Sequence, residues 1–340
     1  MLKVAVVILN WNGRKFLEDF LPSVLKNIPV YAEIIIADND STDDSLSFLQ
    51  QNYPQIRIVQ NLENGGYAKG YNEALEKIEA EYYILLNSDI EVSEKWIEPI
   101  IEFMDLNSKV AACQPKILSF HQRTHFEYAG AGGGFIDKYG YPFCRGRIFQ
   151  EIEKDEGQYN DIKEVFWASG ACMFVRSSVF HELEGLDNDF FAHMEEIDFC
   201  WRAKNNGYKI YYHPKSIVYH VGGGTLPKGN PRKTYLNFRN NFYLLYKNVE
   251  SNKLAIVFAW RLLLDGVAGI KFLLDGSLMD AIAVIKAHFH FYAALGNLQR
   301  KRKKLAQKPV GQVYQRNIVF EHFVKKIKYF NLLNSNRFSN

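Results

Sequence analysis

The chain has 340 residues, of which 47% are hydrophobic and 15% aromatic, and this composition predicts a folded protein. Its net charge of +3 divides unevenly: residues 1–249 hold 26 Lys and Arg against 33 Asp and Glu, whereas residues 250–340 hold 15 against 5. The acidic first part argues against a nucleic-acid-binding protein, and the basic last part is expected to face something anionic. Four widely spaced cysteines indicate neither a zinc knuckle nor a disulfide framework and suit a reducing cytoplasm.

The first ninety residues repeat one pattern, a short apolar run followed by a stretch with helical spacing. Only Lys3 precedes the first run as a charge, so this run is expected to be a buried strand and not a signal peptide. The alternation predicts an α/β fold with a parallel sheet and right-handed crossovers. The apolar runs cover residues 4–9, 33–37, 56–59 and 82–86, and the helical stretches cover 14–27, 43–52 and 67–79, with Ser41 and Thr42 as N-caps of the second.

Each of these four strands is followed by Asn or Asp. In open parallel sheets the binding crevice lies outside the carboxyl ends of the strands, so these side chains are expected to converge on one site. One such residue after a strand is commonly a turn residue, but four strands in succession favour a site. The turn at residues 10–13 lacks the glycine pattern of a dinucleotide-binding oxidoreductase. The polar residues are Asn10, Asn12, Asp38, Asn39, Asn61, Asn64, Asn87 and Asp89.

The pattern loosens over residues 110–165, where many glycines indicate hairpins. Helices are then expected near 177–184 and from Glu195, and strands at 208–213 and 216–221. The rest is expected to be helical over residues 233–248, 253–275, 278–299 and 312–330. We therefore divide the chain into a first domain, residues 1–249, and a basic helical extension, residues 250–340.

The fourth strand ends at Asp89, in the sequence Leu-Leu-Asn-Ser-Asp. A carboxylate held at a strand end suits a hard divalent cation that also binds two phosphate oxygens. Here the sequence resembles family 2 glycosyltransferases of the GT-A fold, which carry an acidic motif at this point. Asn87 in the first motif position resembles the rhamnosyltransferase-like branch. The resemblance implies a Rossmann-like, mostly parallel sheet flanked by helices, with Mg or Mn bound through Asp89.

Two further segments carry the resemblance. Residues 36–43 look like the family's turn after the second strand, where the first acid contacts the nucleotide. Residues 64–72 look like its glycine-rich turn into the third helix, where the backbone approaches a nucleoside-diphosphate sugar and the helix N-terminus favours an anion. Taken alone, Lys69 is a surface lysine, but in this turn it is expected to reach a phosphate. The residues placed on the nucleotide-sugar side are Asn10, Asp38, Asn39, Asn64, Lys69, Asn87 and Ser88.

A second acidic cluster opens the helix near residue 195. Successive helical residues differ by about 100°, so Glu195, Asp198 and Arg202 share one stripe and are expected to form ion pairs. Glu196 points elsewhere. The family carries a Glu-Asp pair here whose second acid takes the acceptor's proton, so the resemblance implies that Glu196 is the base. The alternatives are that Glu195 or Asp198 is the base, or that the acids only favour the helix start.

The resemblance also implies His220 as a metal ligand, because a family histidine before a glycine-rich segment completes that site and neutral imidazole suits it. A lone histidine at a strand end is otherwise a structural residue. Trp167 and Gly170 resemble the family segment that lines the acceptor, where a glycine leaves room for the sugar, and Glu195 is placed on the same side. The alternative is a tightly packed strand.

The C-terminal region has features of a membrane surface protein. Residues 254–274 are strongly apolar but include Arg261, Asp265 and Lys271, so they are expected to lie in the membrane interface and not to span the bilayer. The basic run 300–304 suits an anionic leaflet. Internal helix packing is the alternative. We expect a cytoplasmic protein held at the inner face of the cell membrane.

These features together predict an inverting, metal-dependent glycosyltransferase, because one base without a covalent intermediate gives a single displacement. The donor is expected to be dTDP-rhamnose or a similar nucleotide sugar. The acceptor is expected to be a hydroxyl of a glycan or lipid-linked glycan in cell-surface polysaccharide synthesis. The alternative is a non-catalytic nucleotide-sugar-binding protein, which only turnover distinguishes.

Overall fold

The computed structural model describes residues 2–222 and 230–340, and its first part alternates strands with helices. The strands form because Ile and Val runs are buried on both faces, as in β1, where Val4 to Val7 are fully buried. The predicted elements of this part are confirmed. They are β1 (Leu2–Asn10), α1 (Arg14–Lys26), β2 (Ala32–Asp38), α2 (Ser45–Asn52), β3 (Arg57–Gln60), α3 (Gly66–Leu75) and β4 (Ala80–Asn87).

The middle of the chain adds short strands and three helices. These are β5 (Ile90–Val92), α4 (Glu98–Leu106), β6 (Val110–Ser119), β7 (Gly134–Asp137), β8 (Pro142–Cys144), β9 (Arg147–Ile148), β10 (Glu151–Ile152), β11 (Lys163–Val165), β12 (Cys172–Arg176), α5 (Ser177–Glu182), a 3-10 turn η1 (Asn188–Phe190), α6 (Glu195–Asn205) and β13 (Lys209–His220). The last part is mainly helical. It consists of α7 (Pro231–Asn248), α8 (Ser251–Leu274), α9 (Leu278–Lys304), β14 (Val313–Tyr314), α10 (Ile318–Phe323) and the 3-10 turns η2 (Phe330–Leu332) and η3 (Ser335–Arg337).

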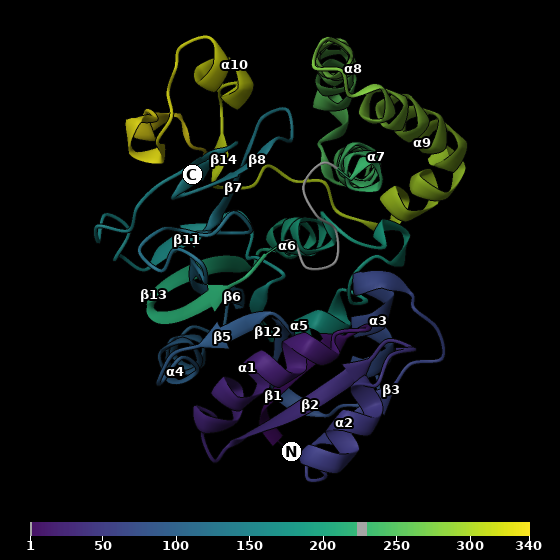
Figure 1. The fold of residues 1–340 in the computed structure, drawn as a ribbon. Coiled ribbons are helices and arrows are strands. Elements are labelled where there is room, and N and C mark those ends of the chain that lie inside the picture. Colours follow the sequence, from purple (N-terminus) through teal and green to yellow (C-terminus); the bar gives the residue numbers. More distant parts are fainter. Residues whose placement is uncertain (1, 223–229) are drawn as a thin grey trace.

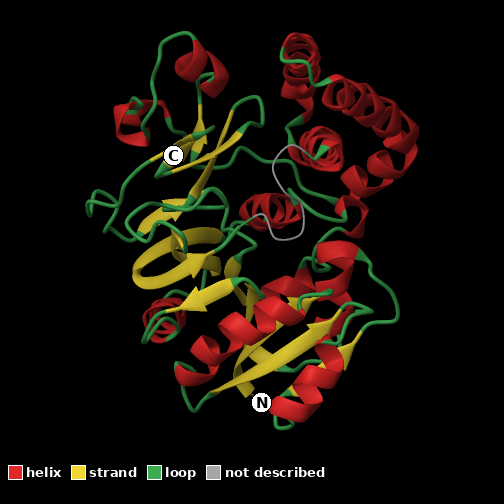
Figure 2. Ribbon diagram, in the orientation of Figure 1, coloured by secondary structure: helices red, strands yellow, loops and turns green. Residues whose placement is uncertain are grey.

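The strands form two sheets. The larger sheet has nine strands in the order β11-β13-β6-β12-β4-β1-β2-β3, with β5 paired to β13, and the smaller has five in the order β10-β9-β8-β7-β14. Strands β3, β2, β1 and β4 are parallel, whereas β12 runs antiparallel between β4 and β6. Helix α6 contacts β6 and β13 as well as α7, and Figure 1 shows it between the larger sheet and the long helices. Figure 2 shows those helices set apart from the strands.

Strand β6 lies inside the region expected to be loose, and only its last residue is not buried. The strand was not predicted because two polar side chains interrupt its apolar pattern. Gln114 accepts a hydrogen bond from the Ser169 amide at 2.9 Å, and Lys116 pairs with Asp155 at 2.6 Å. Because these partners come from distant loops, the polar groups are satisfied inside the fold.

Three further expectations were wrong. Residues 208–213 and 216–221 form one strand, β13, whose register shifts between His213 and Ile217. Residues 312–330 are not one helix, because β14 pairs with β7 and only α10 is α-helical there. Ser41 and Thr42 do not cap α2, which follows Asp44, because their hydroxyls accept hydrogen bonds from the side chains of Asn10 and Asn12 instead.

Helices α8 and α9 lie side by side and leave an apolar surface exposed, here called the α8/α9 face. Its members recur every three or four residues, which places them on one side of each helix. By length and composition, α9 is the one helix in the described ranges that is apolar enough to cross a membrane, a property that core helices of soluble proteins share. The α8/α9 face consists of Ile256, Trp260, Leu263, Val267, Ile270, Leu274, Leu278, Ile282, Ile285, Phe289 and Tyr292.

We expect Tyr314→Ala to lower the free energy of unfolding by about 3 kcal/mol, because it empties a buried aromatic position. Tyr314 is 1% exposed, and its ring centroid lies 4.9 Å from that of Phe338 in a tilted contact and 6.0 Å from that of Phe143 in an edge contact, so it ties the end of the chain to the smaller sheet. Urea unfolding checks this. Tyr329→Ala is the control, since Tyr329 is 44% exposed. Equal midpoints for the two variants would contradict the prediction.

Candidate functional site

The loops that follow β1, β2 and β3 are joined by hydrogen bonds between buried side chains. Asn10 lies level with Asp38 in the sheet, and its Nδ2 donates to Asp38 Oδ1 at 3.1 Å and to Ser41 Oγ at 3.1 Å. Asn39 Nδ2 donates to Asn64 Oδ1 at 2.9 Å. The structure therefore brings Asn10, Asp38, Asn39 and Asn64 together at the carboxyl ends of these strands, and a shared binding site there stays a prediction.

The turn into α3 needs its glycine. Gly66 has φ +77°, and a Cβ there would lie 2.4 Å from the carbonyl oxygen of Phe191. That oxygen accepts a hydrogen bond from the Tyr67 amide at 2.6 Å, so the helix start touches the loop before α6. Lys69 pairs with Glu63 and Glu73, so the structure places its ammonium among carboxylates.

Asp89, His220 and Glu127 form a row of buried side chains at the end of β4. His220 Nε2 lies 3.2 Å from Asp89 Oδ1, and His220 Nδ1 lies 3.0 Å from Glu127 Oε2. Burial lowers the pKa of His220, but the two carboxylates outweigh it and raise that pKa to about 10. Burial opposes the charge of Asp89, yet His220 and the Gly222 amide hold the pKa of Asp89 below its usual value.

The structure thus brings Asp89 and His220 together as the sequence predicted, and it adds Glu127. A carboxylate behind a metal-binding imidazole commonly fixes the orientation of the ring. No signal in the sequence marked Glu127, because it lies in a loop far from both partners along the chain. Gly223 and Gly224 of the glycine motif lie outside the described residues.

The arrangement fits a divalent cation in part. One carboxylate oxygen and one imidazole nitrogen stand side by side, and because His220 is protonated at its raised pKa, a bound cation would take the place of the Nε2 proton. A hard cation takes its other ligands from phosphate oxygens and water. Within residues 2–222 and 230–340, no group of three His, Cys, Asp or Glu is placed to hold a metal by itself. Asn87 and Ser88 are partly exposed at the same strand end, and the Asn87 amide bonds the Ala171 carbonyl at 3.0 Å.

Asp198 is a structural residue of α6. It is fully buried and accepts hydrogen bonds from Arg202 at 2.8 Å, Lys247 at 2.9 Å and Asn248 at 2.8 Å. The predicted pair with Arg202 is confirmed. Glu195 was expected to join it, but the described residues offer Glu195 no ion pair. A carboxylate enclosed by two cations is poorly suited to accept a proton, which removes Asp198 as a candidate base.

Glu195 and Glu196 differ from Asp198 in their surroundings. Glu195 is 4% exposed and Glu196 is partly exposed, and Oε2 of each has no hydrogen-bond partner among the described side chains and backbone. Burial and the neighbouring Glu196 hold the pKa of Glu195 well above its usual range. Burial also raises the pKa of Glu196 to about 7, against the stabilising amides at the start of α6. Such a carboxyl is matched to proton transfer near neutral pH.

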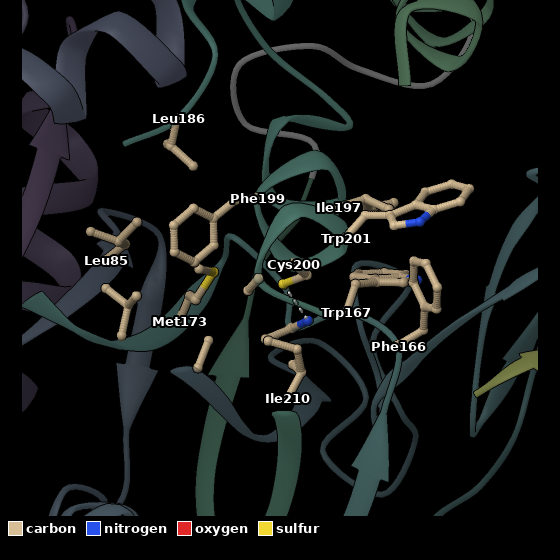
Figure 3. Close-up of a cluster of buried hydrophobic side chains, with 14 of the residues drawn as sticks. Leu85, Phe166, Trp167, Met173, Leu186, Ile197, Phe199, Cys200, Trp201 and Ile210 are labelled. Atoms are coloured by element: carbon tan, nitrogen blue, oxygen red, sulfur yellow. Dashed lines mark hydrogen bonds between the residues drawn. The ribbon is translucent and has the colours of Figure 1, made fainter. Parts of the chain in front are cut away.

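Trp167 and Gly170 occupy different settings. Trp167 is 4% exposed, its indole donates to the Phe135 carbonyl at 2.9 Å, and Figure 3 shows it among buried side chains beside Phe166 and Trp201. The packed-strand alternative therefore describes Trp167, since its ring is enclosed in the core. The carbonyl of Gly170 accepts a hydrogen bond from Tyr67 at 2.6 Å.

Tyr67 is a further residue that sequence analysis missed. Burial raises the pKa of its phenol well above the usual value, and Glu195 and Glu196 contribute to that rise. Tyr67 therefore lies near both glutamates, and it links α3 to the segment that carries Gly170. Its place in the glycine-rich turn was visible in the sequence, but its partners were not.

Comparison with known proteins identifies the family. Residues 5–184, more than half of the chain, match Glycosyl transferase family 2. The chain is 22% identical to an N-acetylglucosaminyl-diphospho-decaprenol L-rhamnosyltransferase of Mycobacterium tuberculosis H37Rv, over 89% of this chain and 97% of that protein. It is 25% identical to the rhamnosyltransferase WbbL of Escherichia coli K12, over 69% of this chain and 92% of that protein.

Solved structures share the fold. The mannosyltransferase PcManGT of Pyrobaculum calidifontis, in complex with GDP-Man and Mn²⁺, aligns with a TM-score of 0.52 and 14% identity over 88% of this chain and 84% of that one. GalNAc-T7 with UDP, GalNAc and Mn²⁺ aligns with a TM-score of 0.59 and 18% identity over 74% of this chain, which spans 49% of that structure. The chain belongs to glycosyl transferase family 2 and resembles the rhamnosyltransferases within it.

Proposed function

We propose that this glycosyltransferase transfers a sugar from a nucleoside diphosphate to an acceptor hydroxyl with inversion, in the synthesis of a cell-surface polysaccharide. One observation carries the proposal. Glu196 is a partly exposed residue whose carboxyl has a buried, unpartnered oxygen and a pKa of about 7, at the start of a helix within a family 2 fold. A binding protein has no need of a carboxyl poised in this way.

In the proposed reaction, Glu196 accepts the proton of the acceptor hydroxyl as its oxygen attacks the anomeric carbon. The new bond joins that oxygen to the anomeric carbon, and the bond from this carbon to the phosphate oxygen breaks. The nucleoside diphosphate leaves with the electron pair. Because attack and departure occur on opposite faces in one step, the configuration inverts. The acceptor side was expected to include Trp167, Gly170 and Glu195. In the proposed site, Gly170 and Glu195 lie on that side together with Tyr67, whereas Trp167 belongs to the core.

At the donor end, Asp89 and His220 would hold Mg²⁺ or Mn²⁺, which neutralises charge on the departing diphosphate when bound. Glu127 fixes the imidazole through its contact at Nδ1. Asp38 and Asn39 are almost fully buried, so they shape the turn beside the nucleotide and Asn10 anchors it. Asn64, Lys69, Asn87 and Ser88 remain proposed donor contacts, with Lys69 required to leave its carboxylate partners. The name of one relative, dTDP-rhamnosyl transferase RfbF of Shigella flexneri, supports dTDP-rhamnose as the donor, and the name of the rhamnosyltransferase WbbL supports rhamnose as the sugar.

A lipid-linked glycan is the proposed acceptor, because the mycobacterial relative is named for a decaprenol-linked one. The α8/α9 face suits this location. Its apolar stripe on α9 continues at the same spacing to Gly296, Arg300 and Lys303, and the two basic residues are exposed. A surface that is apolar at one end and cationic at the other fits the interface of an anionic leaflet. We therefore place the protein at the inner face of the cell membrane.

Asp89→Ala is expected to abolish the metal-dependent part of nucleotide-diphosphate affinity, because it removes the carboxylate ligand. Calorimetry with dTDP and UDP, with Mn²⁺ and after chelation, measures this. Asp40→Ala is the control, since Asp40 is an exposed acid after β2. A variant whose affinity still responds to Mn²⁺ as the parent protein does would refute the assignment of Asp89.

Glu196→Gln is expected to lower turnover by roughly 10²- to 10⁴-fold with little change in donor affinity, because it removes the base and keeps the shape. Glu195→Gln should remain active, since the raised pKa of Glu195 keeps this carboxyl protonated and Gln resembles the neutral acid. The parent rate should rise with pH through about 7, where Glu196 loses its proton. An active Glu196→Gln enzyme beside a dead, folded Glu195→Gln enzyme would reverse the roles, and a parent protein without turnover on any nucleotide sugar would favour the binding protein.

Leu263→Glu combined with Ile285→Glu is expected to release the protein from vesicles that contain phosphatidylglycerol, because both side chains are 58% exposed on the α8/α9 face. Sedimentation at low salt measures this. Leu106→Glu, at an 86% exposed position on α4, is the control and should leave binding unchanged. Equal sedimentation of the double variant and the control would show that this face does not bind lipid.

A further inference from the structure

The loop that leads into α6 has an unusual backbone. Phe191, His193 and Met194 have φ values of +63°, +70° and +75°, in the left-handed region that side chains other than glycine seldom adopt. Glu195 and Glu196 follow at once. Three such residues in a short loop persist only where the surroundings hold them, and such places cluster at functional sites.

Helix α7 supplies bonds that hold this loop. Asn240 is fully buried, and its Nδ2 lies within hydrogen-bond distance of three carbonyls of this segment, those of Phe190 at 2.9 Å, Ala192 at 2.8 Å and His193 at 2.8 Å, so its two N–H groups are shared among three acceptors. The N–H groups of this amide thus bind the backbone of the residues before the glutamates, while its Oδ1 accepts a hydrogen bond from Arg239 Nε at 2.9 Å. A hydrophobic residue at position 240 would remove this donor from the carbonyls of Ala192 and His193, whereas the Phe190 carbonyl would keep its bond from Arg239.

Two neighbouring residues, Arg239 and Tyr67, also donate hydrogen bonds to the backbone of this segment. Arg239 donates to the carbonyls of Asp189 at 2.9 Å and Phe190 at 3.0 Å. From the opposite direction, the Tyr67 amide in the glycine-rich turn donates to the Phe191 carbonyl at 2.6 Å. The loop therefore lies between α7 and the turn placed beside the donor.

We propose that Asn240 is a positioning residue that aims Glu196 at the acceptor by fixing the carbonyls of the loop before α6. The inference rests on the proposed role of Glu196 as the base. Asn240 touches no reacting group and acts through the backbone. Helix α7, the next described element after strand β13 of the larger sheet, thereby becomes part of the catalytic arrangement.

The experiment compares Asn240→Ala with Asn241→Ala. Asn241 is the matched control, because it is the next residue, is 3% exposed and donates at 2.6 Å to the carbonyl of Gly140, away from the loop. The assay follows release of nucleoside diphosphate from whichever dTDP-, UDP- or GDP-sugar the parent protein turns over fastest, with Mn²⁺. Hydrogen exchange of residues 189–198 and melting temperature are measured on the same samples.

Asn240→Ala should lower turnover by about 10²-fold, the cost of misplacing a reacting group by about 1 Å, while the KM for the donor changes little. Exchange over residues 189–198 should speed up. Asn241→Ala should lose melting temperature to a similar extent and keep its turnover. The inference is overturned if Asn240→Ala keeps its turnover, or if Asn241→Ala loses as much.

If Asn240→Ala does not fold, Arg239→Gln tests the same inference, because Arg239 also donates to the backbone of this loop. Arg239 is only partly buried, so its replacement is expected to be tolerated better. Reduced turnover with an unchanged KM supports the inference, and full turnover overturns it. Glu196→Gln separates the two proposals. If Glu196→Gln is fully active, the proposed base is wrong; if it is inactive while Asn240→Ala is fully active, only the positioning role is wrong.

Discussion

The buried carboxylate of Asp198 joins helix α6 to helix α7. A charge with no exposure must be paired, and Asp198 finds its partners on its own helix, in Arg202, and on α7, in Lys247 and Asn248. Loss of Arg202 or Lys247 would leave this buried charge with one cation instead of two, which is expected to destabilise the fold. Helix α7 must therefore lie against α6, and Asn240 can then reach the loop that precedes Glu195.

One turn of α6 holds acids of opposite character because their partners differ. Cations surround Asp198 and keep it ionised, whereas Glu195 and Glu196 meet burial without a cation and their pKa values rise. Helical geometry separates the two groups by direction, and the neighbours in space decide which acid can exchange a proton. At the other end of the site, Asp89 and Glu127 are buried acids kept ionised by a shared histidine.

The sequence was sufficient for features that depend on local pattern. Strands β1 to β4 and helices α1 to α3 were predicted because apolar period and turn residues are local. Strand β6 was missed because Gln114 and Lys116 look solvent-exposed until Ser169 and Asp155 are brought to them. Within the site, Asp89 and His220 were found through motifs, but Glu127 and Asn240 act through contacts that only the assembled fold creates. Lys69 looked free for a phosphate because its pairing with Glu63 depends on how the turn closes.

The change in charge at residue 249 suggested a separable tail, and the division into two domains stays a prediction. The basic run 300–304, however, makes contacts inside the protein as well as lying at its surface. Lys301 pairs with Asp187 at 2.5 Å and with Asp189 at 2.6 Å, in the segment that leads to the base, and Arg302 bonds the Tyr246 carbonyl. Arg300, Lys303 and Lys304 stay exposed on the same helix. Helix α9 thus presents one side to the proposed membrane and the other to the loop before Glu196. A movement of α9 relative to α7 would therefore displace Asp187 and Asp189. For this reason, activity and membrane binding should both be measured on the full chain.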